Sequence, residues 1–473
     1  MSLPRTSPAS VDVSSSAIGA LLDRLERRGI ECHSLMIVRR GHVVAEGWWA
    51  PYSADEPHLL YSLTKSFTAM GVGLVVDDGL LTLDDRIVDV LPHHVPDDIP
   101  AEARVLTVQH LLTMTAGHAE DTLESAWALE PSDLVRGYLR MPIEAAPGTR
   151  HTYDNATTFI LARMIEHVSG QTLPRLLDDR LFGPMGITGA EWDRVGSGAV
   201  FGFHGLHLTT EAVAAFGELM LRGGEWQGRQ LLSREWVASA TRKHIDSRHF
   251  SPGAPGADFH SGYGYQIWMS AHGFHGNGAY GQQCIVVPDL DVVVVLTAAH
   301  TEIGHAQDAL DAIRDSLLPG IDTSGDVGGD LMLMRRLRHL ALPMVHGDPG
   351  PASTDSRAIV DASHPDSGLP SGTPVVLHPQ SGGWLLRFGE LFALPVGFGH
   401  WARSAPLGRP LAAAGAWQGD AFVAELHVVN TPHRVRLTVR GARAELRWVT
   451  VPLTGTDLVT HATSPLMTRP DVA

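Results

Sequence analysis

A serine and a lysine three residues apart, at the start of an apolar segment, are the feature that most constrains what this chain can fold into. From Ser62 to Gly79 the residues favour a helix, with Phe67 and Met70 at helical spacing and Gly79 as a stop signal. Ser62 would then lie at or near the helix N-terminus, where free N–H groups and the helix dipole favour negative charge. Lys65 would lie on the same face. A lysine there can stabilise a serine alkoxide or, when desolvated, take the serine proton itself.

The Ser-x-x-Lys spacing is the one that a class of acyl-transfer enzymes uses. The same residues would also suit a helix N-cap followed by a solvated polar face. The apolar neighbours Phe67, Met70 and Val72 favour the catalytic interpretation, because a lysine inside such a helix is oddly placed unless a cleft opens onto it. The rest of the chain must supply the other parts of a site.

Length and charge restrict the classes of partner. A chain of 473 residues is long for one core, so we expect two domains. A hydrophobic content of 44% with 19% charged residues is typical of a soluble globular protein. The 36 Lys and Arg against 52 Asp and Glu give a net charge of −16, which argues against a nucleic-acid or anionic membrane surface. This charge says little about a small-molecule substrate.

Neither a cofactor nor a metal is expected. Cys32 and Cys284 are the only cysteines, and we interpret both as core thiols. His272 and His275 are spaced as His-x-x-His, but on a strand and turn their side chains would not converge on one ion. The N-terminus has no apolar leader and no later stretch could span a bilayer, so we expect cytoplasmic residence.

Changes in composition divide the chain into four parts. The expected parts are a flexible Ser- and Pro-rich arm, a domain that is helix-rich and then β, a Gly-rich linker with a short helix, and a C-terminal β-domain: 1–14, 15–318, 319–372 and 373–473. Within the second part we expect one amphipathic helix over 122–140 and an antiparallel meander over 262–297. In the last part, alternating residues from Arg434 to Trp448 predict a hairpin.

Two later motifs carry candidate site residues. Tyr153 and Asn155 follow a Pro-Gly turn and precede a helix, so their side chains could point into a cleft. A tyrosine in such a place is more often a packed ring, yet beside a Ser-Lys pair a phenolate is a credible general base. The third motif, His275-Gly276-Asn277-Gly278, lies in the meander. Whether His151 or His204 lines the cleft is left open.

Ser62-x-x-Lys65, Tyr153-x-Asn155 and the third motif, in this order, resemble the serine β-lactamase and penicillin-binding-protein superfamily. The likeness is to its class C-like branch of esterases, D-aminopeptidases and related hydrolases, and it covers about residues 15 to 318. Supporting phrases are Tyr61 to Phe67, Thr107 to Thr113, Pro147-Gly148-Thr149 and Val286 to Asp291. The resemblance implies an α+β fold: an antiparallel sheet flanked by helices, an all-helical subdomain, and then a small C-terminal antiparallel barrel or sandwich, with a lipocalin-like form as one option.

The resemblance also implies roles. Ser62 would be the nucleophile, Lys65 its activating partner, Tyr153 the base that protonates the leaving group, and Asn155 a ligand for a substrate amide or carbonyl. The residues of the third motif, His275, Gly276, Asn277 and Gly278, would bind substrate, and the backbone N–H groups of Ser62 and Gly278 would form the oxyanion hole. His275 stands where lactamases carry lysine and Asn277 where they carry glycine, which argues against potent lactamase activity. The register of this motif could shift by a residue or two.

Three functions stay open at this point. The first is a serine hydrolase that acts on a small ester, amide or peptide through an acyl-enzyme on Ser62. The second is a stand-alone penicillin-binding-protein-type thioesterase or peptide cyclase, which uses the same intermediate with an amine acceptor. The third is a catalytically silent binding or regulatory protein on the same fold. Substrate and oligomeric state do not follow from the sequence.

Overall fold

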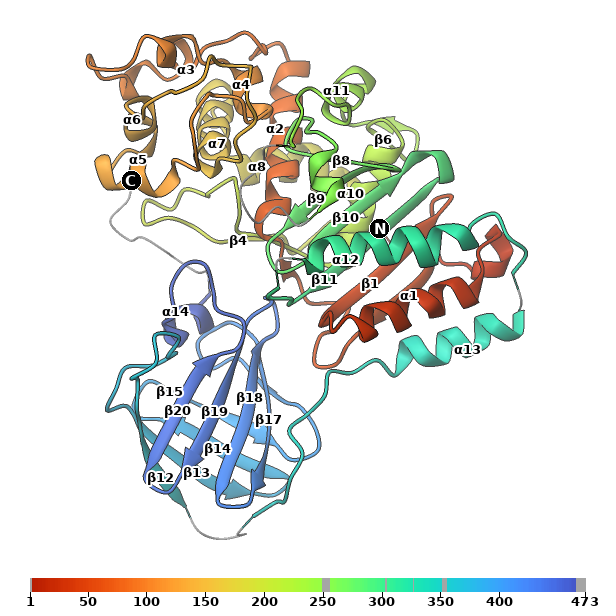
Figure 1. Ribbon diagram of the computed structural model, residues 1–473, viewed down its shortest axis with the longest axis vertical. Helices are drawn as coiled ribbons and strands as arrows, with labels where there is room; N and C mark the ends of the chain where they lie inside the picture. Colours follow the sequence, from red (N-terminus) through yellow and green to blue (C-terminus); the bar gives the residue numbers. More distant parts are fainter. Residues whose placement is uncertain (1, 249–255, 303, 326, 351–354, 465–473) are drawn as a thin grey trace.

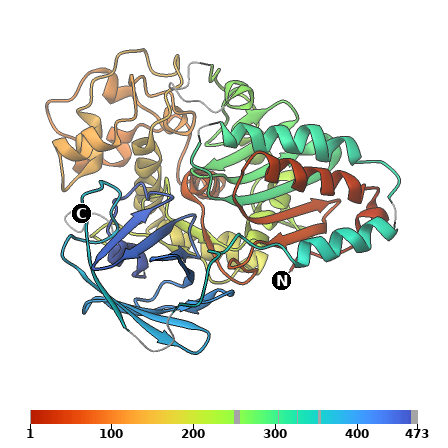
Figure 2. The same ribbon diagram turned by 60° about the horizontal axis from the view of Figure 1, so that its bottom comes forward.

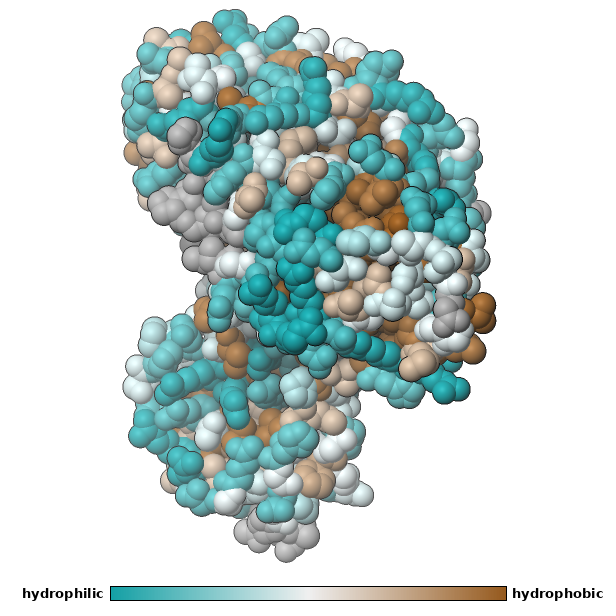
Figure 3. Space-filling view, turned by 45° about the vertical axis from the view of Figure 1, so that its right-hand side comes forward, coloured by the Kyte–Doolittle hydropathy of each residue, from teal (hydrophilic) through white to brown (hydrophobic). Residues whose placement is uncertain are grey.

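The structure, a computed structural model, describes residues 2–248, 256–302, 304–325, 327–350 and 355–464. A large α+β domain lies above a smaller β-barrel (Figure 1). The two form separate lobes that meet at a narrower waist (Figure 3). The predicted fold class, an α+β domain followed by a C-terminal β-domain, is confirmed.

A six-stranded antiparallel sheet organises the large domain. Its order is β2 (His42–Trp48), β1 (Cys32–Arg39), β11 (Val292–Ala298), β10 (Gln282–Val287), β9 (Gly273–Gly278), β8 (Trp268–Ser270). Every residue of β11 is buried, as its valine-rich sequence requires when both faces of a sheet are covered. The antiparallel meander predicted over 262–297 is therefore present, as β8 to β11.

Helices cover both faces of this sheet. One face packs against α1 (Ser15–Arg27), α12 (His305–Ala312) and α13 (Val327–Arg338), seen side by side in Figure 2. The other face packs against α10 (Thr210–Leu221), next to the central helix α2 (Thr64–Asp77). The segment from Ser62 to Gly79 therefore lies in the middle of the domain, on this side of the sheet.

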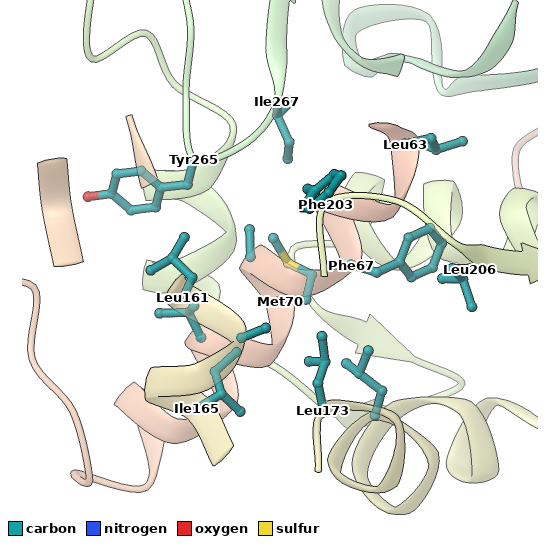
Figure 4. Close-up of a cluster of buried hydrophobic side chains, with 14 of the residues drawn as sticks. Leu63, Phe67, Met70, Leu161, Ile165, Leu173, Phe203, Leu206, Tyr265 and Ile267 are labelled. Carbon is teal, nitrogen blue, oxygen red and sulfur yellow. The ribbon is translucent and has the colours of Figure 1, made fainter. Parts of the chain in front are cut away.

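Helix α2 is buried on all sides, which explains its apolar sequence. Side chains from both the helical subdomain and the sheet side surround it, including Leu161, Ile165 and Leu173 around Met70 (Figure 4). A Cβ on Gly73 would come within 2.4 Å of the Trp236 ring, so only glycine permits this approach. A helix held this tightly fixes the direction of the side chains at its N-terminus.

The all-helical subdomain consists of short helices. They are α3 (Ile87–Val90), α4 (Val108–Leu112), α5 (Leu123–Leu129), α6 (Leu134–Leu139), α7 (Asn155–Ser169), α8 (Leu173–Leu177) and α9 (Gly183–Met185), with α11 (Arg234–Ala240) packed on α2. The single helix expected over 122–140 is wrong: it breaks into α5 and α6. Pro131 cannot continue a helix, and Asp133 caps the second helix by accepting a hydrogen bond from the Arg136 N–H.

The C-terminal domain is an eight-stranded barrel that closes through a parallel pairing of β15 with β17 at Gly397 and Ala414. Its strands are β12 (Ser356–Val360), β13 (Pro374–Gln380), β14 (Gly383–Phe388), β15 (Phe392–Gly397), β17 (Leu411–Gln418), β18 (Ala421–Val428), β19 (Arg434–Arg440) and β20 (Arg443–Trp448), with the short β16 (Ala402–Ser404) beside β17. Side chains including Trp384, Phe388 and Phe422 fill the interior. Helix α14 (Leu458–Ala462) contributes Leu458 to the same core.

Two segments differ from their expected character. In the arm expected over 1–14, Leu3 is buried and Arg5 pairs with Glu46 at 2.8 Å. In the linker expected over 319–372, β12 is a barrel strand that pairs with both β13 and β20, so the barrel begins before residue 373. Pairing with β20, far away in the sequence, therefore orders β12. Residues 1, 326 and 351–354 lie outside the described part of the chain.

Two small sheets complete the large domain, and one of them contacts the barrel. The strand β3 (His58–Leu59) pairs with β5 (Leu206–Leu208), which pairs with β4 (Glu191–Trp192), while β6 (Glu225–Trp226) and β7 (Arg229–Gln230) form a separate ribbon. The Leu59 N–H donates to the carbonyl oxygen of Asn430 in the barrel at 2.8 Å. Throughout the described ranges, every helix is too short or too polar to cross a lipid bilayer.

Candidate active site

Ser62 lies in a single 3-10 turn, Tyr61–Leu63, that runs directly into α2. The turn places Ser62 at the N-terminal end of the helix, as the sequence predicts. Lys65, one turn later, is 1% exposed, and its Nζ lies 2.9 Å from the Ser62 Oγ. The structure therefore brings these two groups into hydrogen-bond contact inside the domain.

Two further oxygens surround the Lys65 amine. Its Nζ donates to the Asn155 Oδ1 at 2.6 Å and to the Phe203 carbonyl oxygen at 3.1 Å. Asn155 is held in turn by Asp121, which accepts from the Asn155 Nδ2 at 2.5 Å. Burial lowers the pKa of Lys65 to about 7, against the opposing charges of Asp121 and Asp154. Near neutral pH this lysine is therefore present as amine as well as ammonium.

The geometry decides which way a neutral Lys65 amine faces. A neutral amine has two N–H bonds and one lone pair. The Asn155 Oδ1 and the Phe203 carbonyl oxygen accept hydrogen bonds and cannot donate, so they take both N–H bonds. The lone pair is then directed at the third neighbour, Ser62, whose hydroxyl can donate its proton. This arrangement suits a general base.

Tyr153 completes the group. Its ring centroid lies 4.8 Å from the Lys65 Nζ, and its ring stacks on Trp268 with centroids 5.7 Å apart and planes at 10°. Burial raises the pKa of the Tyr153 phenol, while its hydrogen bond to Ser62 opposes the shift. The phenol is therefore neutral at physiological pH and has a proton to give.

The third motif lies on β9. Side chains along a strand point alternately to its two faces, so the four residues of the motif divide between them. A Cβ on Gly276 would lie 2.3 Å from Leu63, and one on Gly278 would lie 2.1 Å from the Leu60 carbonyl oxygen, so both glycines face the turn that carries Ser62. A backbone approach this close is one that only glycine permits.

His275 and Asn277 occupy the other face of β9. His275 is fully buried with its ring edge-on to Phe259 at 5.1 Å, and burial lowers its pKa to about 4. Asn277 accepts a hydrogen bond from the Gln283 side chain at 3.3 Å. The structure does not bring these two side chains to Ser62.

A cavity of about 700 Å³ opens over Ser62. Aromatic rings line it, together with two carboxylates and a histidine: Tyr61, Trp127, Phe201, Phe203, Asp121, Glu124 and His204. Burial lowers the pKa of His204 to about 4, so it is uncharged at neutral pH. The C-terminal domain supplies another part of the wall, through Leu453, Thr454 and Thr460. The cavity therefore lies between the two domains.

Comparison with known families agrees with this geometry. The family model described as Beta-lactamase matches residues 18–318, which is more than half of the chain. The chain belongs to the β-lactamase family. Ser62, Lys65, Tyr153 and the glycines of β9 all lie within the matched range.

Relatives of this β-lactamase-family chain include hydrolases. A 6-aminohexanoate-dimer hydrolase of Paenarthrobacter ureafaciens is 26% identical over 61% of the chain and 78% of its own length. The esterase EstB of Burkholderia gladioli is 26% identical over 38% of the chain and 53% of its own length. The solved structure of SurE is similar over 92% of the chain and 99% of its own, with 19% identity and a TM-score of 0.51. The fold likeness to SurE therefore extends beyond the β-lactamase-family domain.

Several residues at the site escaped the sequence analysis. Asp121 holds Asn155, and Phe203 supplies a carbonyl oxygen to Lys65, yet neither belongs to a short motif. Of the two histidines left open, His204 lines the cavity, whereas His151 packs against Tyr263 at 4.9 Å. Leu453, in the wall from the barrel, is 68% exposed despite its apolar side chain, a property that only the structure reveals.

Proposed function

We propose that this protein is a serine hydrolase that cleaves an ester or amide bond through an acyl-enzyme on Ser62. The observation that carries the proposal is the environment of Lys65. Two acceptor oxygens take its N–H bonds and leave the lone pair for the Ser62 hydroxyl. A buried lysine with its pKa lowered to about 7 is matched to this task at neutral pH.

The reaction follows from these positions. The Lys65 amine takes the Ser62 proton while the Ser62 Oγ attacks the carbonyl carbon, giving a tetrahedral intermediate with a negative oxygen. The Tyr153 phenol gives its proton to the leaving alcohol or amine, and the Lys65 ammonium restores the proton to Tyr153. Water, or an amine, then attacks the Ser62 ester while the Lys65 amine takes its proton, and that proton passes to the Ser62 Oγ as the acyl group leaves. In this scheme Lys65 is the base and Tyr153 the acid.

The roles of Asn155 and of the third motif also change in this proposal. Asn155 orients Lys65 and is itself held by Asp121. Its first proposed role is therefore to position the base, and its contact with the substrate is second. From β9 only the backbone near Gly276 and Gly278 approaches the nucleophile. The N–H groups of Ser62 and Gly278 remain the proposed oxyanion hole, whose loss would raise the barrier by about 3 kcal/mol.

The cavity favours a substrate with an apolar acyl group and no carboxylate. Its lining is rich in aromatic rings and holds Asp121 and Glu124, while the lining residues that the structure describes include no arginine or lysine. A carboxylate next to these two acids would be repelled, and no arginine or lysine among these lining residues would offset the repulsion. The names of two relatives, a dimer hydrolase and an esterase, support amide or ester cleavage.

Intact mass spectrometry after incubation with a fluorophosphonate tests the proposal. We expect one covalent adduct on the wild-type chain and none on Ser62→Ala. Tyr153→Phe should retain the fold and lose turnover by about 100-fold or more, since it removes the proton donor. Ester hydrolysis that persists in Ser62→Ala would refute the proposal, and a wild-type chain that forms no adduct would favour the silent binding protein.

A second assay separates hydrolysis from aminolysis. Apolar acyl esters are offered with and without a primary amine, and the products are identified by mass. Free acid in both reactions indicates a hydrolase. An amide product that dominates at low amine concentration would indicate the acyl-transfer alternative.

A further inference from the structure

We infer that the C-terminal barrel holds the nucleophile in position, through a hydrogen bond from Tyr61 to His433. This inference rests on the proposed role of Ser62. Tyr61 directly precedes Ser62 in the chain, and His433 lies just before β19, 372 residues away. His433 is thus a positioning residue that acts through Tyr61.

The direction of the hydrogen bond follows from the second nitrogen of the ring. The His433 Nδ1 lies 3.0 Å from the carbonyl oxygen of Thr450, which can only accept, so Nδ1 carries the proton. The Nε2 of the neutral ring is then an acceptor, and the Tyr61 hydroxyl donates to it at 2.5 Å. Both side chains are almost fully buried, at 3% and 2% exposure. A buried hydroxyl and ring nitrogen paired in this way are costly to separate.

The backbone at Tyr61 explains why such a restraint is needed. Tyr61 has a φ of +49°, in the left-handed region that a bulky residue adopts only at a cost of about 1 to 3 kcal/mol. This conformation turns the chain from β3 into the 3-10 turn that carries Ser62. Without a contact that holds the Tyr61 side chain, the turn would relax and move Ser62 relative to Lys65.

The barrel fixes neighbouring parts of the same site. The Asn430 carbonyl oxygen accepts from the Leu59 N–H at 2.8 Å and faces the His207 ring at 3.2 Å. The Tyr280 hydroxyl donates to the Val451 carbonyl oxygen, and its ring meets Tyr61 and His433 edge-on at 5.3 and 5.2 Å. The barrel thus touches the segment before the nucleophile and the loop after β9.

The test compares variants for the rate at which a fluorophosphonate labels Ser62. Tyr61→Phe keeps the ring and removes the donor, and His433→Leu removes the acceptor. We expect each to slow labelling by on the order of 10- to 100-fold, since a misplacement of about 1 Å has that effect. The double variant should be no slower than the slower single variant, because both remove one contact. His433→Gln, which restores an acceptor near Nε2, should recover part of the rate.

Tyr52→Phe is the matched control. The Tyr52 hydroxyl also crosses to the barrel, where it donates to the Thr431 carbonyl oxygen at 3.2 Å, and Tyr52 is buried to a similar degree. It is outside the turn that carries Ser62. Tyr52→Phe should lower the melting temperature as Tyr61→Phe does, while the labelling rate stays near that of the wild type.

Each outcome decides the inference. Labelling of Tyr61→Phe at the wild-type rate, or equal slowing by Tyr52→Phe, would overturn it and leave the proposed function intact. Additive effects in the double variant would show that the two residues act separately, and would overturn it too. A wild-type chain that is never labelled would overturn the proposed function, and this inference with it.

Discussion

The pKa of Lys65 gives the most direct prediction, a steep loss of activity on the acid side of pH 7. Burial lowers this pKa from 10.5 to about 7. At pH 7 about half of the lysine is then the neutral amine, against about one part in 3,000 for an unshifted lysine. Between pH 8 and pH 5 the neutral fraction falls from about 90% to about 1%, so we expect the rate to fall by about 90-fold.

The assay is the second-order rate constant for fluorophosphonate labelling of Ser62, measured from pH 5 to pH 9. We call the fall in rate at low pH the acid limb of the profile. Because the charge of Asp121 raises the pKa of Lys65, Asp121→Asn should lower that pKa further and move the acid limb to lower pH. The asparagine keeps a side-chain oxygen that can still accept from Asn155. Glu124→Gln, in the same cavity lining, is the control and should leave the limb in place.

Two results would refute this reasoning. A rate that is level from pH 5 to pH 8 would mean that Lys65 does not take the proton. A limb that moves to higher pH in Asp121→Asn would mean that the titrating group does not feel the charge of Asp121, because the loss of a negative charge lowers the pKa of any nearby group. Either result would remove Lys65 as the general base.

Four further results are expected. Gly278→Ala should slow labelling of Ser62 by about tenfold or more, because its Cβ would lie 2.1 Å from the Leu60 carbonyl oxygen and displace the turn that carries Ser62. The labelling rate is measured by mass spectrometry, as the fraction of adduct against time. Gly19→Ala, in the middle of α1 with open space around it, should stabilise the fold by about 0.5 to 1 kcal/mol in urea unfolding. Leu453→Ala should raise KM for long-chain esters more than for acetate esters, since it removes apolar wall from the cavity. Thermal stability should fall as the pH drops below about 6.5, because burial lowers the pKa of four histidines: His33, His58, His427 and His433. Below that pH the unfolded chain binds protons that the folded chain does not, which favours unfolding. A melting temperature unchanged down to pH 5 would contradict this prediction.

Local signals in the sequence found the centre of the site. Ser62 and Lys65 lie one helical turn apart, so their contact follows from spacing alone. Tyr153 precedes α7 and Asn155 is its first residue, and a Pro-Gly turn and the Asp154 N-cap fix the entry of the helix. The strand alternation from Arg434 to Trp448 predicted β19 and β20 for the same reason, since period and turn residues are local properties.

What the sequence did not yield depends on contacts between distant segments. His275 and Gly276 are neighbours on β9, and a shift of one residue decides which of them faces Ser62, so the register could not be settled from the motif. Strand β12 lies in a stretch with the composition of a linker and is ordered by pairing with β20, late in the chain. The wall formed by Leu453 depends on how two domains meet, which no local pattern records.

The bond between Tyr61 and His433 also has a consequence for synthesis of the protein. The two partners are 372 residues apart, so the first is made long before the second. A nascent chain that has formed the sheet and α2 still lacks the acceptor for Tyr61 until the last strands of the barrel leave the ribosome. A product that stops short of β19 would therefore carry Ser62 and Lys65 without the contact that we infer positions Ser62, and we expect a fluorophosphonate to label it more slowly than the whole chain.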